Sequence, residues 1–373
     1  MIKLLIYNSL IISLISFLLA LLISIIDKLV NNYGEINIDI NDGNKILKVK
    51  GGSPLLFLLS DNKIFVPSAC GGRGSCAMCK VKVKSDIGPL LPTESGYMNE
   101  EEKREGVRLS CQIKVKKDIN IELPEQLFNV KEYLCKVKSI KDLTSNIKEI
   151  RLELPENNEL NFTSGQYIQL EAPAYEKIKA GTQRAYSIAS SPKNKNYFEL
   201  IIGLVPNGIV TTYIFKYLKE GDNIKIVGSF GDFNRKDTDN DMICVAGGTG
   251  MAPIRSIIHD MIEKKIMNRK IWYFFGAGTL SDLYYIKEFQ EIEKEYSNFK
   301  FIPTLANPEK NDKWKGETGL VTEALEKYLK NKINKESIKE GYLCGSPGMI
   351  DACIKVMTSN GIPEDKIYYD KFA

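Results

Sequence analysis

The sequence lacks a concentration of basic residues, an internal repeat and a low-complexity tract. Its 373 residues carry 51 Lys and Arg against 47 Asp and Glu, for a formal net charge of +4, and the lysines are spread along the chain. Proteins that bind nucleic acid usually gather their basic residues into a patch or stripe, so this balance argues against nucleic-acid binding. The content of 43% hydrophobic and 26% charged residues is that of a globular protein and argues against disordered, collagen-like and polytopic membrane classes.

Charge is missing altogether from one segment near the N-terminus. Leu4–Ile26 is 23 residues long and contains no charged side chain. A helix of that length extends about 34 Å, which exceeds the roughly 30 Å of a bilayer's hydrocarbon core. A cleaved signal peptide has a shorter apolar region, and no A-x-A-like cleavage site precedes Asp27. The sequence therefore predicts a retained single-pass transmembrane anchor within residues 1–33, and the flanking charges do not settle its orientation.

The rest of this long chain divides into three blocks by its pattern of elements. Residues 34–127 contain short β-type runs around a cysteine-bearing loop, which predicts a small mixed α+β domain. Residues 128–236 contain six runs separated by Gly, Pro and Asn turns, which predicts an antiparallel β-barrel. Residues 237–373 alternate strands and helices, which predicts an α/β domain with an open parallel sheet. The strands expected in the barrel are 133–140, 147–154, 166–171, 184–190, 197–205 and 223–230.

The cysteines are spaced for an iron–sulfur cluster. Four of the eight, Cys70, Cys76, Cys79 and Cys111, follow the spacing C-x5-C-x2-C with the fourth 32 positions later. A [2Fe–2S] cluster is held by four thiolates, and the glycines of CGGRGSCAMC allow three of them to come from one tight loop. Zinc usually takes paired C-x2-C knuckles, and disulfides would need an oxidising compartment, which the remaining scattered cysteines do not indicate. The spacing therefore predicts a [2Fe–2S] cluster, with one residue more in the first gap than the plant-type pattern.

A candidate flavin site stands near the start of one barrel strand, at Arg184, Ala185, Tyr186 and Ser187. A bound flavin needs a cation for its diphosphate, an aromatic side chain beside its ring and a hydrogen-bond partner near N5. Alternation along a strand sends Arg184 and Tyr186 to the same side of the sheet. Taken alone, the tetrapeptide is more typical of a plain strand with an exposed Arg and a half-buried Tyr.

Further along the barrel block, Gly208–Thr212 opens a helix. The free N–H groups of that helix and the hydroxyl of Thr211 are suited to holding a phosphate. Thr211 is alternatively an ordinary helix N-cap, and that role is compatible with ligand binding.

Glycines also mark a strand-to-helix junction in the third block, where GGTGMAP occupies Gly247–Pro253. The spacing differs from the Rossmann G-x-G-x-x-G, but glycines here let a pyrophosphate approach the helix N-terminus. Near the end of the chain, residues 344–347 (CGSP) follow another apolar strand, at the edge where parallel sheets form their ligand crevice. For Cys344, a buried structural thiol is the alternative interpretation.

In this order and spacing, the motifs resemble the ferredoxin-NADP reductase superfamily fused to a [2Fe–2S] domain. The chain is similar over nearly its whole length to the F subunit of the sodium-translocating NADH:quinone oxidoreductases (Na+-NQR). The resemblance rests on the N-terminal anchor and on CGGRGSCAMCKVKV, EGVRLSCQIKVKKDINIELPEQLF, SGQYIQLEAPA, RAYSIAS, AGGTGMAPIRS, YLCGSPGMI and YYDKFA. It implies a transmembrane helix, a β-grasp ferredoxin domain, an antiparallel barrel for FAD and an α/β domain for NADH.

The resemblance also implies roles for individual residues. The implied cluster ligands are Cys70, Cys76, Cys79 and Cys111. The implied FAD-binding residues are Arg184, Tyr186, Ser187, Gly208, Thr211 and Thr212. The implied NADH-binding residues are Gly247, Gly248, Thr249, Gly250, Pro253, Gly345 and Pro347. The implied catalytic residues are Ser187, Cys344 beside the nicotinamide, and Phe372, which covers the flavin ring where the nicotinamide stacks.

By the same resemblance, the protein passes hydride from NADH to FAD and single electrons through the cluster. Its implied partners are the other membrane subunits of an NADH:quinone oxidoreductase, with quinone as the terminal acceptor reached through them. NADH and reduced thiolates are expected in the cytoplasm, which places the catalytic domains there and the helix in the inner membrane. The alternatives are a free-standing NADH-dependent reductase that serves an oxygenase and a non-catalytic membrane scaffold.

The sequence departs from that family at two places. Only Tyr175–Gln183 separate the EAPA-like and RAYS-like motifs, where family members carry a longer insertion, and Ser346 replaces the first proline of a CGPP-like motif. Asn307-Pro308 stands where NADPH users tend to have a Ser-Arg pair, so no cation is offered to a 2′-phosphate, which favours NADH. The single histidine, His259, is expected at the surface, because this chemistry needs no histidine acid or base.

Overall fold

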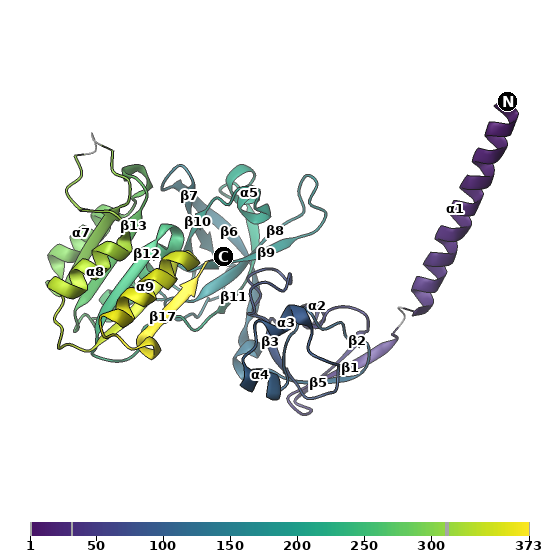
Figure 1. Ribbon diagram of the computed structural model, residues 1–373, viewed down its shortest axis with the longest axis horizontal. Coiled ribbons are helices and arrows are strands. Elements are labelled where there is room, and N and C mark those ends of the chain that lie inside the picture. Colours follow the sequence, from purple (N-terminus) through teal and green to yellow (C-terminus); the bar gives the residue numbers. More distant parts are fainter. Residues whose placement is uncertain (1, 31–32, 310–312, 373) are drawn as a thin grey trace. The chain divides into compact units, whose positions relative to one another are not determined.

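The computed structural model describes residues 2–30, 33–309 and 313–372 (Figure 1). The chain divides into two compact units, the first formed by residues 1–68 and 72–129 and the second by residues 69–71 and 130–373. The barrel block and the parallel-sheet block thus group together in the second unit. The domain boundaries expected after residues 33, 127 and 236 stay predictions.

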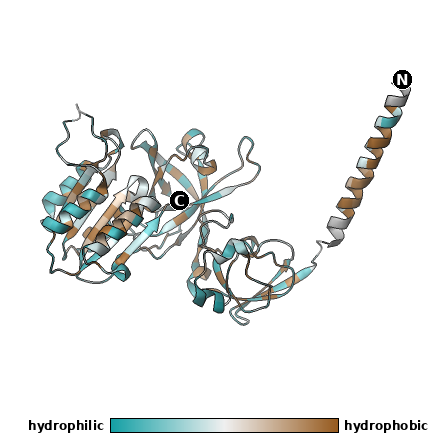
Figure 2. Ribbon diagram, in the orientation of Figure 1, coloured by the Kyte–Doolittle hydropathy of each residue, from teal (hydrophilic) through white to brown (hydrophobic). Residues whose placement is uncertain are grey.

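The N-terminal helix α1 (Ile2–Val30) is apolar on all sides, and Figure 2 shows it hydrophobic over most of its length. Residues Ile6–Ile25 are long and apolar enough to cross a membrane, and none of this span is buried inside the protein. Leu10, Ile12 and Phe17 are each more than 60% exposed. A helix without a polar face and without a protein cover requires an apolar solvent. These properties agree with the predicted anchor.

A five-stranded mixed sheet forms the first unit, in the order β2-β1-β5-β3-β4. Only the β1–β5 pair is parallel. Ile36, Ile38 and Ile40 alternate along β1 and pack with Leu55 and Leu59 of α2 in one core, because every second side chain of a strand faces the same side. The elements are β1 (Glu35–Ile40), β2 (Lys45–Lys50), α2 (Leu55–Asp61), β3 (Lys80–Val83), α3 (Pro92–Ser95), α4 (Glu100–Arg104), β4 (Val107–Leu109), β5 (Ile119–Glu122) and η1 (Glu125–Asn129).

A buried ion pair joins α3 to β4 in this unit. Glu94 is fully buried, and its carboxylate accepts hydrogen bonds from Arg108 Nη2 at 2.7 Å and from the Leu109 backbone N–H at 2.9 Å. A buried charge is tolerated only when it is paired in this way. Neither α3 nor β4 was among the elements predicted from the sequence, because runs of four and three residues are too short to show a hydrophobic period.

The second unit contains a six-stranded antiparallel sheet in the order β10-β7-β6-β11-β8-β9. Its two edges meet where Ile188 pairs with Leu200 and where the Ala189 N–H donates to the Glu199 carbonyl at 2.7 Å, so the sheet closes into the predicted barrel. All six predicted strands are present. The elements are β6 (Lys131–Asp142), β7 (Ile147–Glu153), β8 (Tyr167–Ala172), β9 (Thr182–Ser187), β10 (Tyr197–Gly203), α5 (Ile209–Lys216) and β11 (Asn223–Phe230).

A six-stranded parallel sheet completes the second unit, in the order β15-β14-β13-β12-β16-β17. This is the predicted α/β domain, with the addition of β15, whose two residues carry no periodic signal. The strands are β12 (Asp241–Gly247), β13 (Ile271–Ala277), β14 (Phe299–Leu305), β15 (Glu317–Thr318), β16 (Lys339–Gly345) and β17 (Ile367–Lys371). The helices are η2 (Gly248–Gly250), α6 (Met251–Glu263), η3 (Leu280–Asp282), α7 (Ile286–Glu295), α8 (Val321–Asn331), α9 (Pro347–Ser359) and η4 (Glu364–Lys366).

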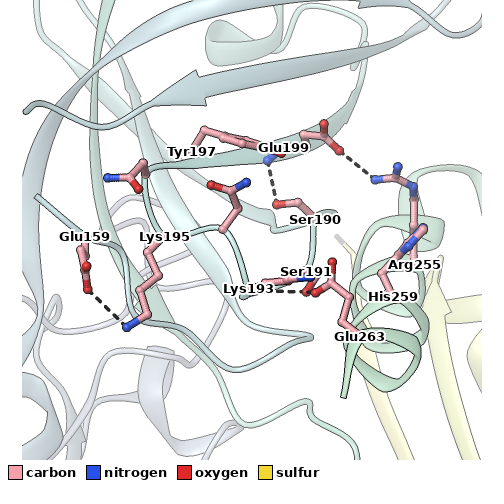
Figure 3. A pocket seen from close by; sticks show the side chains of 12 residues that line it. Glu159, Ser190, Ser191, Lys193, Lys195, Tyr197, Glu199, Arg255, His259 and Glu263 are labelled. Carbon is pink, nitrogen blue, oxygen red and sulfur yellow. Dashed lines mark hydrogen bonds and ion pairs between the residues drawn. The ribbon is translucent and has the colours of Figure 1, made fainter. Parts of the chain in front are cut away.

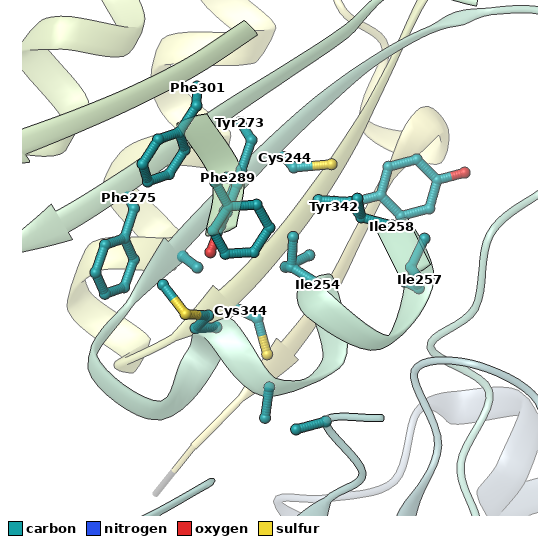
Figure 4. Close-up of a cluster of buried hydrophobic side chains, with 14 of the residues drawn as sticks. Cys244, Ile254, Ile257, Ile258, Tyr273, Phe275, Phe289, Phe301, Tyr342 and Cys344 are labelled. Atoms are coloured by element: carbon teal, nitrogen blue, oxygen red, sulfur yellow. The ribbon is translucent and has the colours of Figure 1, made fainter. Parts of the chain in front are cut away.

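Helices cover both faces of the parallel sheet. Along β12, Cys244 packs into a cluster with α6 and α7, whereas its neighbour Val245 packs into a second cluster with α8 and α9. Figure 4 shows the first cluster, where Phe289 of α7 lies against Tyr273 of β13 with ring centroids 4.9 Å apart. Because both faces are covered, ligands reach the sheet at the carboxyl ends of its strands.

Candidate functional site

The cysteine loop between α2 and β3 turns through left-handed backbone conformations. Gly72 and Gly74 have φ of +86° and +78°. A Cβ atom at Gly72 would lie 2.9 Å from the Phe57 ring, and one at Gly74 would lie 2.6 Å from Gln112 Nε2. The backbone conformation therefore favours glycine at both positions, and a Cβ at either would also displace the end of a neighbouring side chain.

Two of the four predicted cluster ligands, Cys79 and Cys111, lie within hydrogen-bonding distance of each other. Cys79 and Cys111 are both buried, and the Ser110 N–H donates to the Cys79 carbonyl at 2.8 Å. The hydrogen bond between the two thiols and their burial raise the pKa of Cys79. Gln112 Nε2 lies 3.5 Å from Cys111 Sγ, as a donor to that sulfur. A bound iron would reverse the pKa shift, because a coordinating thiol is deprotonated.

The other two predicted ligands, Cys70 and Cys76, are half-buried, and Cys70 belongs to the segment 69–71 of the second unit. Within the described residues, no three His, Cys, Asp or Glu side chains are grouped as a metal site. The structure thus brings together Cys79 and Cys111 but not the complete set of four. None of the eight cysteines is in a disulfide, so no disulfide competes with cluster ligation. Four cysteine thiolates are the donor set that a [2Fe–2S] cluster uses.

The candidate flavin residues lie on β9. Arg184 pairs across the sheet with Leu170, and Tyr186 pairs with Ile168, so both side chains face the same side as predicted. Tyr186 packs against the barrel core, and burial raises the pKa of its hydroxyl. Arg184 Nη1 donates to the Gln183 carbonyl at 2.6 Å.

If Thr211 were the N-cap residue, the candidate phosphate-binding helix α5 would begin at Thr212. The helix instead begins at Ile209, about one turn earlier. Gly208, not Thr211, is the N-cap residue. The buried Thr211 hydroxyl instead lies 3.2 Å from both the N–H and the carbonyl of Val205, and so closes the turn before the helix. A Cβ at Gly208 would lie 2.6 Å from Thr211 Oγ1, which explains the glycine. Thr211 therefore shapes the turn, while the half-exposed Thr212 follows it in the first turn of the helix.

The glycine loop after β12 is held against the end of β16. A Cβ atom at Gly250 would lie 2.1 Å from the carbonyl oxygen of Cys344, so the two backbones are in direct contact. Gly248 is different, because it is exposed, has a φ of +54° and would have no atom within 4 Å of a Cβ. Its carbonyl accepts a hydrogen bond from the Tyr284 hydroxyl at 2.7 Å. The loop thus has one packed glycine and one open glycine, and the open one leaves room for a ligand.

A cavity of about 440 Å³ lies at the carboxyl ends of the parallel strands. Gly248, Gly276–Gly278 and Ala306, which follow or end β12, β13 and β14, form its wall with Met349 of α9. The lining contains one carboxylate, Asp282, and no Lys or Arg. This is the crevice in which doubly wound sheets bind their ligands.

The predicted catalytic residues Cys344 and Phe372 lie next to the glycine loop that follows β12. The Cys344 thiol is fully buried, lies 3.5 Å from the Asp370 carbonyl as a donor, and has its pKa raised by burial. Cys344 is a neutral thiol in the buried cluster of Figure 4, as the alternative interpretation of a buried structural thiol requires. The Phe372 N–H donates to the Gly345 carbonyl at 2.9 Å, and its ring packs against the same cluster.

Sequence reasoning missed a charged network beside a larger, polar cavity of about 600 Å³ (Figure 3). Arg255, Glu199, Glu263 and His259 are among the residues that line it. His259 is half-buried, with Nε2 2.8 Å from Glu288 Oε1, so it lies at the edge of the cavity and has a charged partner that was not expected. The signal in the sequence is Arg255 itself, a cation that directly follows the glycine motif GGTGMAPI.

The two loop glycines make a matched pair for mutation. We expect Gly250→Ala to cost about 3 kcal/mol or more, because backbone must move to admit the Cβ atom. Gly248→Ala should cost only about 1 kcal/mol, the strain of a left-handed alanine. The measurement is thermal unfolding of the detergent-solubilised chain. Equal destabilisation by the two substitutions would contradict the close contact at Gly250.

Comparison with known proteins follows the same division of the chain. A "2Fe-2S iron-sulfur cluster binding domain" model matches residues 38–116, an "Oxidoreductase FAD-binding domain" model matches 134–234, and an "Oxidoreductase NAD-binding domain" model matches 244–355. These matches give the protein a [2Fe–2S] cluster, FAD and NAD(H) as its cofactors.

Solved structures share the fold. An Amycolatopsis cytochrome P450 reductase, GcoB, is 24% identical with a TM-score of 0.70, and the match covers 90% of this chain and 98% of that one. The ferredoxin reductase in carbazole 1,9a-dioxygenase is 22% identical with a TM-score of 0.68, over 91% of this chain and 99% of that one. At these identities, the likeness concerns the fold alone.

Curated relatives match more closely. The F subunit of the Na(+)-translocating NADH-quinone reductase of Serratia proteamaculans is 36% identical over 96% of this chain and 97% of its own length. The protein of the same name from Neisseria gonorrhoeae is 38% identical over 95% of this chain and 96% of its own length. Since the similarity extends over nearly all of both chains, this chain belongs to the family of F subunits of the Na(+)-translocating NADH-quinone reductases.

Proposed function

We propose that the protein is a membrane-anchored NADH dehydrogenase that serves as the electron-input subunit of an ion-translocating NADH:quinone oxidoreductase. The observation that carries this proposal is the similarity to the curated F subunits along nearly the whole chain. The order of the modules supports it, since one chain joins an apolar helix, a cluster domain, a flavin barrel and a nucleotide-binding sheet.

Different residues of the chain bind the cluster and FAD. When bound, FAD accepts hydride from NADH and the cluster carries electrons one at a time. In the proposal, the cluster is held by Cys70, Cys76, Cys79 and Cys111. Arg184 supplies a cation for the flavin diphosphate, and Tyr186 and Ser187 border its ring.

The nucleotide site is built largely from backbone. The open Gly248 lets a diphosphate approach the start of α6, and the packed Gly250 holds the loop at the end of β16. Cys344 borders the nicotinamide as a neutral thiol rather than a nucleophile, because its pKa is raised by burial. Phe372, held by its backbone to Gly345, covers the flavin ring.

The proposal extends to location and partners. We infer that α1 is retained in the inner membrane and that the catalytic domains lie in the cytoplasm, where NADH and reduced thiols are found. Electrons then pass to the other membrane subunits of the complex and reach quinone through them. A single helix offers no ion path, so any ion translocation belongs to those subunits.

A second candidate is a free-standing reductase that delivers electrons to an oxygenase or another mobile acceptor. The short β8–β9 connection favours it, because the loop folds back on its own barrel. The Tyr175 hydroxyl donates to the Ile209 carbonyl at 2.6 Å, and its ring lies 5.6 Å from Tyr213 and 5.2 Å from Tyr217. A loop held in this way leaves less surface for the partners that a longer insertion would meet.

Native gels of detergent-extracted membranes, stained for NADH oxidation, separate the two candidates. We expect the active band to contain this chain together with several polytopic membrane subunits. An active band that contains this chain alone would favour the free-standing reductase.

Loss of a cluster ligand should separate the two redox centres. We expect Cys76→Ser to remove the visible and EPR signals of the cluster while NADH still bleaches the flavin, because the barrel has its own core. Cys353→Ala, in α9, is the control and should retain the cluster. Cluster signals that persist in Cys76→Ser would remove this residue from the ligand set.

Loss of the proposed flavin cation should weaken FAD binding. We expect Arg184→Ala to lower FAD content at least tenfold at limiting FAD, which corresponds to about 1.4 kcal/mol, a typical value for a hydrogen bond to a charged group. Arg235→Ala is the control. FAD content is measured by fluorescence after denaturation, and equal content in both variants would contradict the assignment of Arg184.

A further inference from the structure

The guanidinium of Arg255 bonds to both halves of the second unit at once. Its Nη1 donates to Glu199 Oε2 of β10 at 2.9 Å and to the Ala189 carbonyl, just past β9, at 3.2 Å. Its Nε and Nη2 donate to the carboxylate of Glu288 in α7 at 2.8 and 3.2 Å. One side chain of α6 thus joins the barrel to the parallel-sheet module, as Figure 3 shows for the Arg255–Glu199 contact.

Both partners of the contact across the two modules are buried and held in place. The side chains of Arg255 and Glu199 are only 12% and 8% exposed. Glu199 also accepts from Arg151 Nη2 of β7 at 2.5 Å, and the Arg255 guanidinium lies 4.7 Å from the ring centroid of Tyr285. A desolvated, charge-assisted contact of this kind fixes geometry as well as adding energy.

The positions of these residues in the chain connect the two proposed cofactor sites. Arg255 stands two residues after Pro253, at the end of the nucleotide loop, and Ala189 stands two residues after Ser187, at the end of the flavin strand. Movement of α6 relative to β9 and β10 would therefore move the nucleotide loop relative to the flavin residues.

A polar cavity lies beside the Arg255–Glu199 contact and increases the share of this pair in joining the two modules. The cavity of about 600 Å³ opens between the 190–197 segment and α6, so side chains there do not pack continuously. Apolar packing also joins the modules, since Ala189 and Ile201 belong to the same buried cluster as Ile257 of α6. At the cavity itself the link is polar: the Arg255–Glu199 pair, the Ser256 Oγ donation to the Ser190 carbonyl at 2.7 Å, and the Ser191–Glu263 hydrogen bond.

We propose that Arg255 is a positioning residue for hydride transfer, which acts through Glu199 to hold the nucleotide loop in register with the flavin strand. The inference rests on the proposed function, because it requires NADH and FAD at these sites. Hydride transfer needs reacting atoms about 3–3.5 Å apart, and a displacement of 1 Å costs about 10²-fold in rate. The Arg255–Glu199 contact is therefore able to affect the rate without touching either cofactor.

The test uses the two carboxylates that hold Arg255, which differ in the module they belong to. Glu199→Gln weakens the link between modules, whereas Glu288→Gln weakens a similar pair inside the nucleotide module. Stopped-flow absorbance of the full-length, cofactor-loaded protein gives the limiting rate of flavin reduction and the apparent Kd for NADH. The long-wavelength band of the nucleotide–flavin complex and the thermal midpoint are recorded for each variant.

We expect Glu199→Gln to reduce the limiting rate at least tenfold and to weaken the long-wavelength band, with the apparent Kd within twofold of wild type. Glu288→Gln should stay within twofold in both rate and Kd. Equal slowing by the two variants, or a change in Kd alone, would overturn the positioning role. If Glu199→Gln loses its flavin, Arg255→Lys replaces it, because lysine keeps the charge without the two-sided fork, and the same rate and Kd criteria apply. A wild-type flavin that NADH does not reduce would reject the proposed function itself.

Discussion

A backbone contact with no room for a side chain determines the geometry of the nucleotide end of this protein. Gly250 meets the carbonyl of Cys344 so closely that a Cβ would lie 2.1 Å from it. This contact fixes the start of α6 against the end of β16, and the next carbonyl, that of Gly345, accepts from the Phe372 N–H. The glycine loop, the buried thiol and the C-terminal aromatic residue are thus parts of one rigid junction. Gly248 remains the open position of this junction.

Charge pairing provides the second constraint, at the face where apolar packing gives way to a polar cavity. Burial acts to raise the pKa of Glu288, but hydrogen bonds from His259 and Arg255 outweigh it and lower the pKa to about 2. Glu199 has a lowered pKa for the same reason, since Arg151 and Arg255 both contact it against the effect of burial. Both carboxylates are therefore ionised at neutral pH, and the charge of their pairs with arginine does not depend on pH in that range. The barrel and the parallel-sheet module share a buried apolar cluster around α6, and ionic contacts add to it along this face.

The sequence predicted the elements better than the contacts between them. The six barrel strands and the alternating parallel sheet follow from hydrophobic period and turn residues, which are local properties. The interpretation of Thr211 as a helix N-cap was wrong, because a threonine that caps a helix and one that closes the preceding turn look alike in sequence. The partners of His259 and Arg255 could not be predicted, since Glu288 and Glu199 lie 29 and 56 residues away along the chain. The spacing of the cysteines predicted a ligand set, of which the structure assembles Cys79 and Cys111.

The connection after α1 is short, which matters for electron delivery if α1 lies in a membrane. Only four residues separate Val30, the last of α1, from Glu35, the first of β1, and four residues span at most about 14 Å. If α1 remains in a bilayer, the cluster domain is confined to a thin layer above it. In that case the short tether replaces a search in three dimensions by encounters within the plane of the membrane. The protein would then give its electrons to acceptors that lie at the same membrane surface.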